Sequence, residues 1–450
     1  MLREGQPRPR ALGLWPATAL VIGHTIAVGI FLTPAQLIGS LASPILTITV
    51  WAVCGALVFA GALTFGELAA RYPQAGGLYI YLREGWGERL GFLYGWQSLL
   101  VMDPGVTAAL AAGLSEYAVV LWPAGRGHER AIAVGVVWLL AVCAMAGLSF
   151  TTRALGTLTA VKVLALLAVV ATAFASGHGQ WSHFATPAAA PRTMPIAAAL
   201  AAALVGAFFS FGGFWEASRI AGEIDRPSVT LPRALALGVA AVTLVYVVTT
   251  CAFIYLVPAD AVTSSAEFAR RAGEAMMGSG GPSVLAAVVL LSVTVSMLAL
   301  LVMAPRLYVA MAQDGLFPRA LASIHRATGA PVRATGLMAV LASAFVLAGT
   351  FQEIVAFFIC TALVFVALAA AALFVVRRRT TGAPAFSVPG YPLVPALFVL
   401  LVGCVTLLIA VNQPWQAAAG CGLMLAGLPV HAVLKARGGL RSHAGEGGRE

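Results

Sequence analysis

The sequence predicts an all-helical membrane protein with twelve transmembrane helices, and three observations lead to this fold class. Hydrophobic residues make up 60% of the 450 residues and charged residues only 10%, with a mean hydropathy of +0.93. Soluble domains carry about 25% charged residues. Apolar runs long enough to cross the hydrocarbon core, about 20 residues, recur along the whole chain. Loops with many basic residues alternate along the chain with loops that have few. These features exclude disordered, collagen-like, disulfide-scaffold and secreted-enzyme classes.

The twelve expected spans are separated by short stretches rich in glycine, proline or charge. Short polar tails, residues 1–12 and 436–450, flank them. In chain order the spans are 13–38, 43–70, 90–122, 131–149, 155–176, 194–223, 231–257, 283–312, 334–350, 352–376, 391–411 and 414–435.

The distribution of basic residues predicts the orientation in the membrane. Twelve spans place both termini on one side, and if that side is the cytoplasm, 19 of the 27 basic residues face it and five face outward. The other three, Lys162, Arg219 and Arg306, lie within spans or near their ends. This is the positive-inside pattern, which accounts for the net charge of +10 without a nucleic-acid partner. We therefore expect a multi-pass protein of the cell membrane with both termini in the cytoplasm.

Signatures of metal, cofactor or catalytic sites are missing from the sequence. The six cysteines all lie in apolar runs without CxxC or Cys/His spacing, so they are interpreted as core residues. The seven histidines are scattered, with no HExxH or HxxxD pattern, and there is no GxxxxGK[ST] loop for nucleotide binding. We expect no metal, no cofactor, no enzymatic activity and no direct drive by ATP.

Two spans are interrupted by glycine at matching positions. The first contains Gly23, Gly29 and Pro34, and the sixth contains Gly212 and Gly213 at its centre. Glycine also serves simple close packing between membrane helices, which is the alternative interpretation for either span alone. Spans 1–5 and 6–10 form two sets of five, and an odd number inverts the second set. Interrupted helices at corresponding positions of inverted repeats indicate a transporter site.

The sequence thus predicts a first five-helix repeat at 13–176, an inverted second repeat at 194–376, and two further helices at 391–435. A broken helix leaves backbone N–H and C=O groups unpaired at mid-membrane, where lipid cannot satisfy them. The N–H groups favour a carboxylate and the C=O groups an ammonium. A zwitterion fits both.

The sequence resembles the amino acid–polyamine–organocation (APC) superfamily, and within it the L-type and bacterial small-neutral amino-acid exchangers. The resemblance runs from about residue 13 to residue 435. It rests on five motifs in order: IGHTIAVGIF (22–31), GELAARYPQAGGLY (66–79), FSFGGFWE (209–216), the segments AGE, RP and LPRA between 221 and 234, and PRLYVAMAQDGLFP (305–318).

This resemblance implies a LeuT-type fold and a substrate site at the two breaks. The α-carboxylate is expected on the N–H groups of Ala27, Val28 and Gly29, and the α-amine on carbonyls around Thr25, Ile26 and Phe209. Val28 stands where relatives have a small residue, which would narrow the carboxylate end. The complete expected set is Thr25, Ile26, Ala27, Val28, Gly29, Ile30, Phe209, Ser210, Phe211, Gly212, Gly213 and Trp215.

Lys162 is one of only two lysines and lies about two turns into the fifth span. A charged group at that depth marks function by default, although a lysine can also extend to the interface. In relatives the matching lysine occupies the sodium site of sodium-coupled members, and Tyr246 matches a seventh-helix tyrosine that partners it. An ammonium there can replace the cation, and it can also lose its proton because burial disfavours charge.

Four further ionisable residues are possible gate or proton sites. Asp103 could bind a proton, cap a helix or form an ion pair, and Glu216 follows the sixth-span break. Glu67 and Arg71, one turn apart, suit a structural ion pair or an inner gate. His24 precedes the first break and is more simply a structural histidine than a proton relay.

These patterns predict a sodium-independent secondary transporter of neutral L-amino acids that works by alternating access and exchange. Phe209, Phe211 and Trp215 give the second break an apolar surface, which favours neutral side chains. Proton symport, or a cationic amino-acid or polyamine substrate, remains open because of Asp103 and Glu216. A membrane enzyme and an amino-acid sensor on a transporter fold are the other classes. The expected partners are the amino acid and membrane lipid, with no obligate protein subunit.

Overall fold

The computed structural model describes residues 12–27, 29–146, 148–186, 195–262, 265–349, 351–380, 382, 384–412 and 414–436. Over these ranges the secondary structure is helical, apart from one isolated parallel bridge between Leu12 and Ile224. The predicted all-helical class is confirmed.

The first half of the chain forms ten helical elements. They are α1 (Leu14–Thr25), α2 (Gly29–Leu41), α3 (Pro44–Arg71), α4 (Leu78–Trp86), α5 (Glu88–Gln97), the π-helix η1 (Ser98–Met102), α6 (Asp103–Leu121), η2 (Pro123–Gly125), α7 (Glu129–Met145) and α8 (Leu148–Ala175).

The second half follows the same succession of long helices and short connectors. Its elements are η3 (Trp181–Phe184), α9 (Ile196–Ser210), η4 (Phe214–Glu223), α10 (Pro227–Leu256), η5 (Ala259–Ala261), α11 (Ser265–Met277), η6 (Gly278–Gly280), α12 (Gly281–Gln313), η7 (Arg319–Ala322), α13 (Val332–Ala348), α14 (Phe351–Arg379), α15 (Leu393–Asn412), α16 (Pro414–Leu425) and α17 (Gly427–Ala436).

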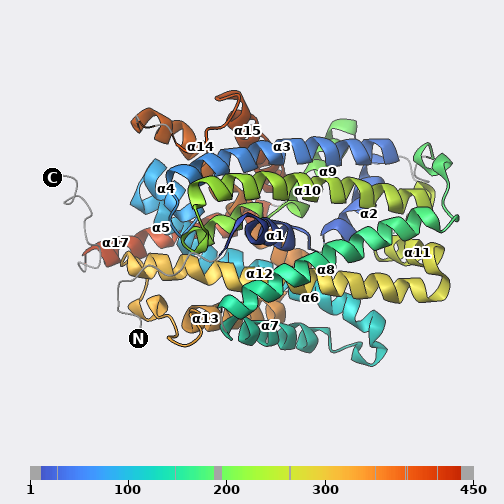
Figure 1. Cartoon of the computed structure of the whole chain (residues 1–450), viewed down its shortest axis with the longest axis horizontal. Helices are drawn as coiled ribbons and strands as arrows, with labels where there is room; N and C mark the ends of the chain where they lie inside the picture. Colours follow the sequence, from blue (N-terminus) through green and yellow to red (C-terminus); the bar gives the residue numbers. More distant parts are fainter. Residues whose placement is uncertain are drawn as a thin grey trace.

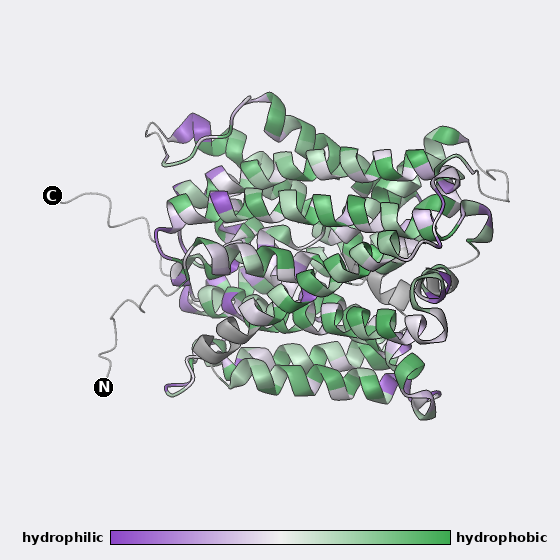
Figure 2. Ribbon diagram, turned by 45° about the vertical axis from the view of Figure 1, so that its right-hand side comes forward, coloured by the Kyte–Doolittle hydropathy of each residue, from purple (hydrophilic) through white to green (hydrophobic). Residues whose placement is uncertain are grey.

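The helices account for all twelve predicted apolar runs. Among the described residues, nine helical segments are long and apolar enough to cross a membrane. The three other runs correspond to the broken pair α1/α2 and to α7 and α13, which have 17 residues each. Figure 2 shows the long helices mostly hydrophobic along their length, with polar residues mainly towards the two ends of the bundle. The protein is therefore a multi-pass membrane protein.

Some local features differ from the sequence expectation. The segment between the seventh and eighth spans, expected to be a loop, contains the amphipathic helix α11, whose buried residues Phe268, Ala272 and Met276 recur at helical spacing on one face. A separate short helix, α4, precedes the third span. The last span divides at residue 426 into α16 and α17. Hydropathy identifies long apolar runs but carries little information on short amphipathic helices.

Four of the five helices of the first set pack against their counterparts in the second set. The pairs in contact are α2 with α9, α3 with α10, α6 with α12, and α7 with α13. Figure 1 shows α3 and α10 side by side across the bundle. Two inverted repeats related by a two-fold axis produce this pairing, so the contacts agree with the predicted five-plus-five organisation. The exact repeat boundaries remain a prediction.

Small residues allow close contacts of α10 with α3 and with α1. A Cβ on Gly55 of α3 would lie 2.3 Å from Thr243 of α10, and one on Gly238 of α10 would lie 2.5 Å from Val21 of α1. Such close approach of backbones is characteristic of helix packing in membranes, where van der Waals contact replaces the hydrophobic effect.

We expect Gly55→Ala to lower the thermal stability of the purified protein, because the new methyl group overlaps the Thr243 side chain. Overpacking of this kind costs about 1–3 kcal/mol. Gly403→Ala on α15 is the control, since a Cβ there meets nothing within 4 Å. Thermal unfolding in detergent, followed by size-exclusion fluorescence, measures both. Equal midpoints for the two variants would contradict the packing role.

Candidate functional site

Two helix breaks form the centre of the structure. The first lies between α1, which ends at Thr25, and α2, which begins at Gly29; Ile26 has an extended backbone with φ −74° and ψ 96°. The second lies between α9 and the 3-10 helix η4, where Gly213 adopts a left-handed conformation with φ +92°. Val28 lies outside the described residues, so its expected effect on the carboxylate end stays a prediction.

The two breaks contact one another through positions that only glycine fits. A Cβ on Gly29 would lie 2.6 Å from the Ser210 hydroxyl, and one on Gly213 would lie 2.5 Å from the His24 ring. The hydroxyls of Thr33 and Ser210 are 2.7 Å apart and hydrogen bond across the same contact. The glycines read from the sequence therefore allow close approach of the two interrupted helices.

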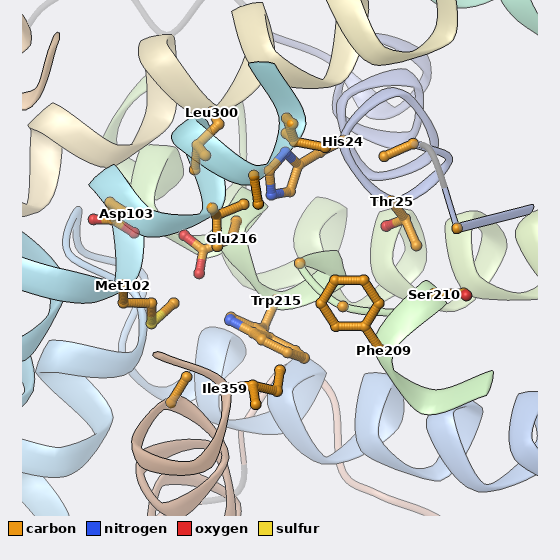
Figure 3. Close-up of a pocket in the computed structure, with 18 of the residues that line it drawn as sticks. His24, Thr25, Met102, Asp103, Phe209, Ser210, Trp215, Glu216, Leu300 and Ile359 are labelled. Carbon is orange, nitrogen blue, oxygen red and sulfur yellow. The ribbon is translucent and has the colours of Figure 1, made fainter. Parts of the chain in front are cut away.

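A cavity of about 110 Å³ lies between the breaks and α6, α12 and α14 (Figure 3). It can hold several water molecules or a small solute. Its lining is mostly apolar, with few polar side chains. The lining residues are His24, Thr25, Ala27, Gly29, Met102, Asp103, Val106, Ala109, Leu110, Phe208, Phe209, Ser210, Gly212, Gly213, Trp215, Glu216, Leu300, Ile359, Ala362 and Leu363.

Most of the residues expected at the substrate site line this cavity. Three do not: Ile26, Ile30 and Phe211 are buried elsewhere. The Phe211 ring packs at the edge of Trp51, with ring centroids 5.8 Å apart. A sequence motif places a residue at the break, but the direction of its side chain depends on the local backbone. The expected residues that do line the cavity are Thr25, Ala27, Gly29, Phe209, Ser210, Gly212, Gly213 and Trp215.

The backbone N–H and C=O groups at the breaks differ in how many hydrogen bonds they already make within the protein. The first N–H groups of α2, beginning with Gly29, have no partner within the helix. The three carbonyls expected to meet an α-amine each accept a protein hydrogen bond: Thr25 from Tyr246, Ile26 from Lys162, and Phe209 from the Gly212 N–H. Because a carbonyl oxygen has two lone pairs, those of Thr25 and Phe209 can each accept one more bond, whereas the Ile26 carbonyl also accepts from the Ser296 hydroxyl at 2.8 Å and is fully used.

Lys162 is fully buried and fills an all-oxygen site beside the first break. Its ammonium lies 3.0 Å from the Gly23 carbonyl, 3.0 Å from the Ser292 carbonyl and 3.0 Å from the Ser296 hydroxyl, and it also donates to the Ile26 carbonyl. The fifth helix thus supplies a cation to carbonyls freed by the broken first helix.

Tyr246 is also buried but does not hydrogen bond to Lys162. Its hydroxyl lies 2.7 Å from the Ser210 carbonyl and 3.0 Å from the Thr25 carbonyl, so it joins the two breaks. The expected direct contact with Lys162 is replaced by this arrangement, because the backbone of the first break lies between the two side chains. They are linked through the consecutive carbonyls of Thr25 and Ile26.

A buried cluster of charged and phenolic groups lies at the end of the cavity that Asp103 and Glu216 line. Arg219 donates to Asp103 Oδ2 at 2.8 Å and to the Tyr94 hydroxyl at 2.8 Å, and its Nε lies 2.5 Å from Glu216 Oε2. Tyr308 donates to the same oxygen of Asp103 at 2.6 Å. Sequence reasoning singled out Asp103 and Glu216 but not their partners. The only signal for Arg219 was a basic residue inside an apolar span.

Glu67 and Arg71 lie away from the cavity, at one end of the bundle. Glu67 is paired with Arg71 at 2.9 Å and with Arg377 of α14 at 2.5 Å, and it accepts from the Val388 N–H at 2.7 Å. The expected ion pair is present within a larger network that ties α3 to α14. Either a structural or a gating role is compatible with this arrangement.

The same end of the bundle carries a second ionic group. Asp314, which follows α12, accepts from the Tyr79 hydroxyl at 2.6 Å and from Arg83 at 2.7 Å. Burial, and then the Asp314 carboxylate, raise the pKa of Tyr79, so its phenol stays a neutral donor. The isolated β-bridge joins Leu12, just before α1, to Ile224, just after η4. These contacts connect the start of α1 to η4, and α4 to α12.

The amino acid permease family model matches residues 12–428. The chain belongs to this family of membrane transporters. The predicted resemblance to the APC superfamily is confirmed.

The names of several relatives of this permease state what those proteins transport. The serine/threonine exchanger SteT of Bacillus subtilis is 28% identical over 441 residues, which cover 97% of this chain and 99% of that protein. The human cystine/glutamate transporter is 26% identical, with 94% and 84% covered. The large neutral amino acids transporter small subunit 2 of Rattus norvegicus is 26% identical, with 94% and 80% covered.

We expect Gly29→Ala to weaken amino-acid binding by at least about tenfold, because a Cβ there overlaps Ser210 and separates the two breaks. Gly39→Ala on the same helix is the control, since a Cβ there meets nothing within 4 Å. Radioligand binding to purified protein measures both variants. Unchanged affinity in Gly29→Ala would show that contact between the breaks is not needed for the site.

Proposed function

We propose that this permease is a sodium-independent exchanger of neutral L-amino acids that works by alternating access. The observation that carries the proposal is the pair of contacting helix breaks facing one mostly apolar cavity. Family membership supports amino-acid transport, and the names of SteT and of the large neutral amino acids transporter subunit support neutral substrates and exchange.

The head group of the amino acid would bind at the breaks. Its carboxylate would accept from the free N–H groups at the start of α2, where the helix dipole also favours negative charge. Its ammonium would lie near the carbonyls of Thr25 and Phe209. Both sets of backbone groups border the cavity through Thr25, Gly29 and Phe209.

The side chain of the substrate would occupy the apolar part of the cavity. Phe209, Trp215, Leu300 and Ile359 provide apolar surface there (Figure 3). An aliphatic or small polar side chain gains from this burial, whereas an extended cationic one must desolvate its charge.

Lys162 would take the place of a bound sodium ion. Its ammonium already occupies an oxygen cage at the first break, so a second cation there would meet like charge. A permanently protonated Lys162 favours obligatory exchange. A proton-coupled symporter is the second candidate, and the buried carboxylates of Asp103 and Glu216 at the cavity favour it.

We also propose that the protein resides in the cell membrane with both termini in the cytoplasm, that it carries out no enzymatic reaction, and that it needs no obligate protein subunit. The uneven distribution of basic residues supports the orientation. All six cysteines lie within helices, so none stands in a connecting loop to form a disulfide with a subunit. Purification of a single active chain tests this last point.

Reconstitution into proteoliposomes tests the transport proposal. We expect uptake of labelled neutral L-amino acids to rise with unlabelled amino acid inside and to be the same in sodium and choline buffers. Stronger competition by arginine or lysine than by neutral amino acids would overturn the substrate class. Uptake driven by a proton gradient into empty vesicles would favour symport, and absence of any transport by protein that still binds amino acids would favour a sensor.

We expect Lys162→Ala to reduce exchange at least about tenfold or to uncouple it, because the variant leaves carbonyls of Gly23 and Ser292 without this donor in a buried site. Lys435→Ala is the matched control, since Lys435 is the only other lysine and lies exposed near the end of α17. Initial exchange rates at several pH values compare them. Unchanged kinetics and pH dependence in Lys162→Ala would falsify the role of Lys162.

A further inference from the structure

His24, at the end of α1, has a ring nitrogen at the cavity that no described group binds. The residue is 7% exposed and lines the cavity. Its Nδ1 lies 3.4 Å from the Ser296 carbonyl of α12. In the ranges that the structure describes, nothing hydrogen bonds to its Nε2. Because buried polar groups are nearly always hydrogen bonded, this nitrogen indicates a place for a polar ligand group.

The contact with Ser296 decides the hydrogen-bonding role of Nε2. A carbonyl oxygen only accepts, so Nδ1 carries the proton of this bond, and in a neutral imidazole the other nitrogen is then an acceptor. A protonated ring would bury a charge whose Nε2–H meets no acceptor in the described part of the chain, which is costly. Nε2 of His24 therefore offers a lone pair.

The second break holds the Nε2 side of the ring at the cavity. The Cδ2–Nε2 edge lies against Gly213, where a Cβ would come within 2.5 Å of both ring atoms. A left-handed glycine at this position leaves room for the imidazole. In Figure 3 the His24 ring lies between the labelled side chains of Leu300 and Thr25 and points into the pocket.

Two backbone acceptors of the breaks lie close to His24. Thr25 follows it directly in the chain. The Phe209 carbonyl accepts from the N–H of Gly212, which precedes the Gly213 that His24 touches. Thr25 and Phe209 both line the cavity, and each carbonyl oxygen has one lone pair left. Together with Nε2 they make three acceptors around the head-group site.

The Ile26 carbonyl, which the sequence also suggests as an amine ligand, is fully used. It accepts from Lys162 and from the Ser296 hydroxyl. A primary ammonium has three N–H donors, so with only two backbone carbonyls one donor would stay unsatisfied. The Nε2 of His24 supplies the missing third acceptor.

A set made of acceptors alone identifies the ligand group. A carboxylate also only accepts, so it cannot satisfy the set, and a hydroxyl donates a single hydrogen bond. A primary ammonium donates to all three acceptors. A secondary ammonium donates two hydrogen bonds and turns a carbon atom towards the third acceptor.

We propose that His24 binds the substrate, with its Nε2 accepting the third hydrogen bond of a primary α-ammonium group, so that the permease selects primary over secondary amines. The inference rests on the proposed function and adds one side chain to a head-group site otherwise made of backbone. Through Nδ1, the His24 ring also connects the ligand to Ser296, and the Ser296 hydroxyl binds Lys162.

Methylation of the substrate amine tests the proposal. L-alanine has a primary ammonium, and N-methyl-L-alanine has a secondary one of the same charge. We expect wild-type protein to bind L-alanine at least about tenfold more tightly, since the secondary amine leaves one acceptor unsatisfied and hydrogen bonds to charged groups are the stronger class. Proline, whose amine is also secondary, should bind weakly as well. Competition against a labelled neutral amino acid, with purified protein in detergent, measures the three affinities.

Two substitutions separate the roles of the ring nitrogens. His24→Asn places an amide near the position of Nδ1, where it can donate to the Ser296 carbonyl, but it has no atom at the position of Nε2. The alanine-to-N-methylalanine ratio should fall towards one, through weaker binding of alanine. His24→Gln reaches the position of Nε2 with an amide oxygen and should keep most of the wild-type ratio.

His183→Asn and His183→Gln are the matched controls. Nδ1 of His183 also lies close to a backbone carbonyl, that of Tyr255 at 2.9 Å. His183 belongs to η3 and does not line the cavity. Both control variants should have the wild-type ratio.

Thermal unfolding in detergent shows whether each variant is folded, and His24→Ala replaces His24→Asn if the latter is not. Equal affinities for alanine and N-methylalanine in wild type would overturn the inference while leaving neutral exchange intact. An equal loss of both ligands in His24→Asn would overturn it in favour of a structural role for the ring. An unchanged ratio with altered pH dependence would overturn it in favour of a proton relay. Failure of wild type to bind any neutral amino acid would instead refute the proposed function.

Discussion

Every polar backbone group within a membrane must find a partner inside the protein, and this structure depends on two places where a helix cannot supply one. At the ends of α1 and α9 the helical hydrogen bonds stop in the middle of the bundle. Unpaired groups of this kind cost several kcal/mol each in hydrocarbon. The protein meets that cost by placing the two breaks against each other and surrounding them with buried donors. The first N–H groups of α2 have no partner within their own helix.

Two buried donors, Lys162 and Tyr246, bind different carbonyls at the breaks. Lys162, from α8, binds the carbonyls of Gly23 and Ile26 on one side of the first break. Tyr246, from α10, binds those of Thr25 and Ser210 on the other side and so joins the first break to the second. A change that alters either set of contacts must move the helices that supply them. This gives the broken helices a physical link to the surrounding bundle, which alternating access requires.

The cavity itself combines two environments. Its aromatic and aliphatic walls reward burial of a neutral side chain, and the Asp103, Arg219 and Glu216 cluster provides charge-balanced hydrogen-bonding capacity at one end. Small cavities of this kind separate substrates by chemistry as well as by size.

The sequence by itself determined the fold class, the number of apolar spans and the positions of both breaks, because hydropathy and glycine placement act locally and periodically. It also singled out Lys162, since a lysine at that depth is costly without a partner. The tertiary structure alone decided which residues share the cavity. Phe211 packs against Trp51 although its neighbours Ser210 and Gly212 line the cavity, and Arg219 pairs with Asp103 although 116 positions separate them in the chain. Side-chain direction at a break and pairing between distant helices depend on packing, for which a single sequence carries no periodic signal.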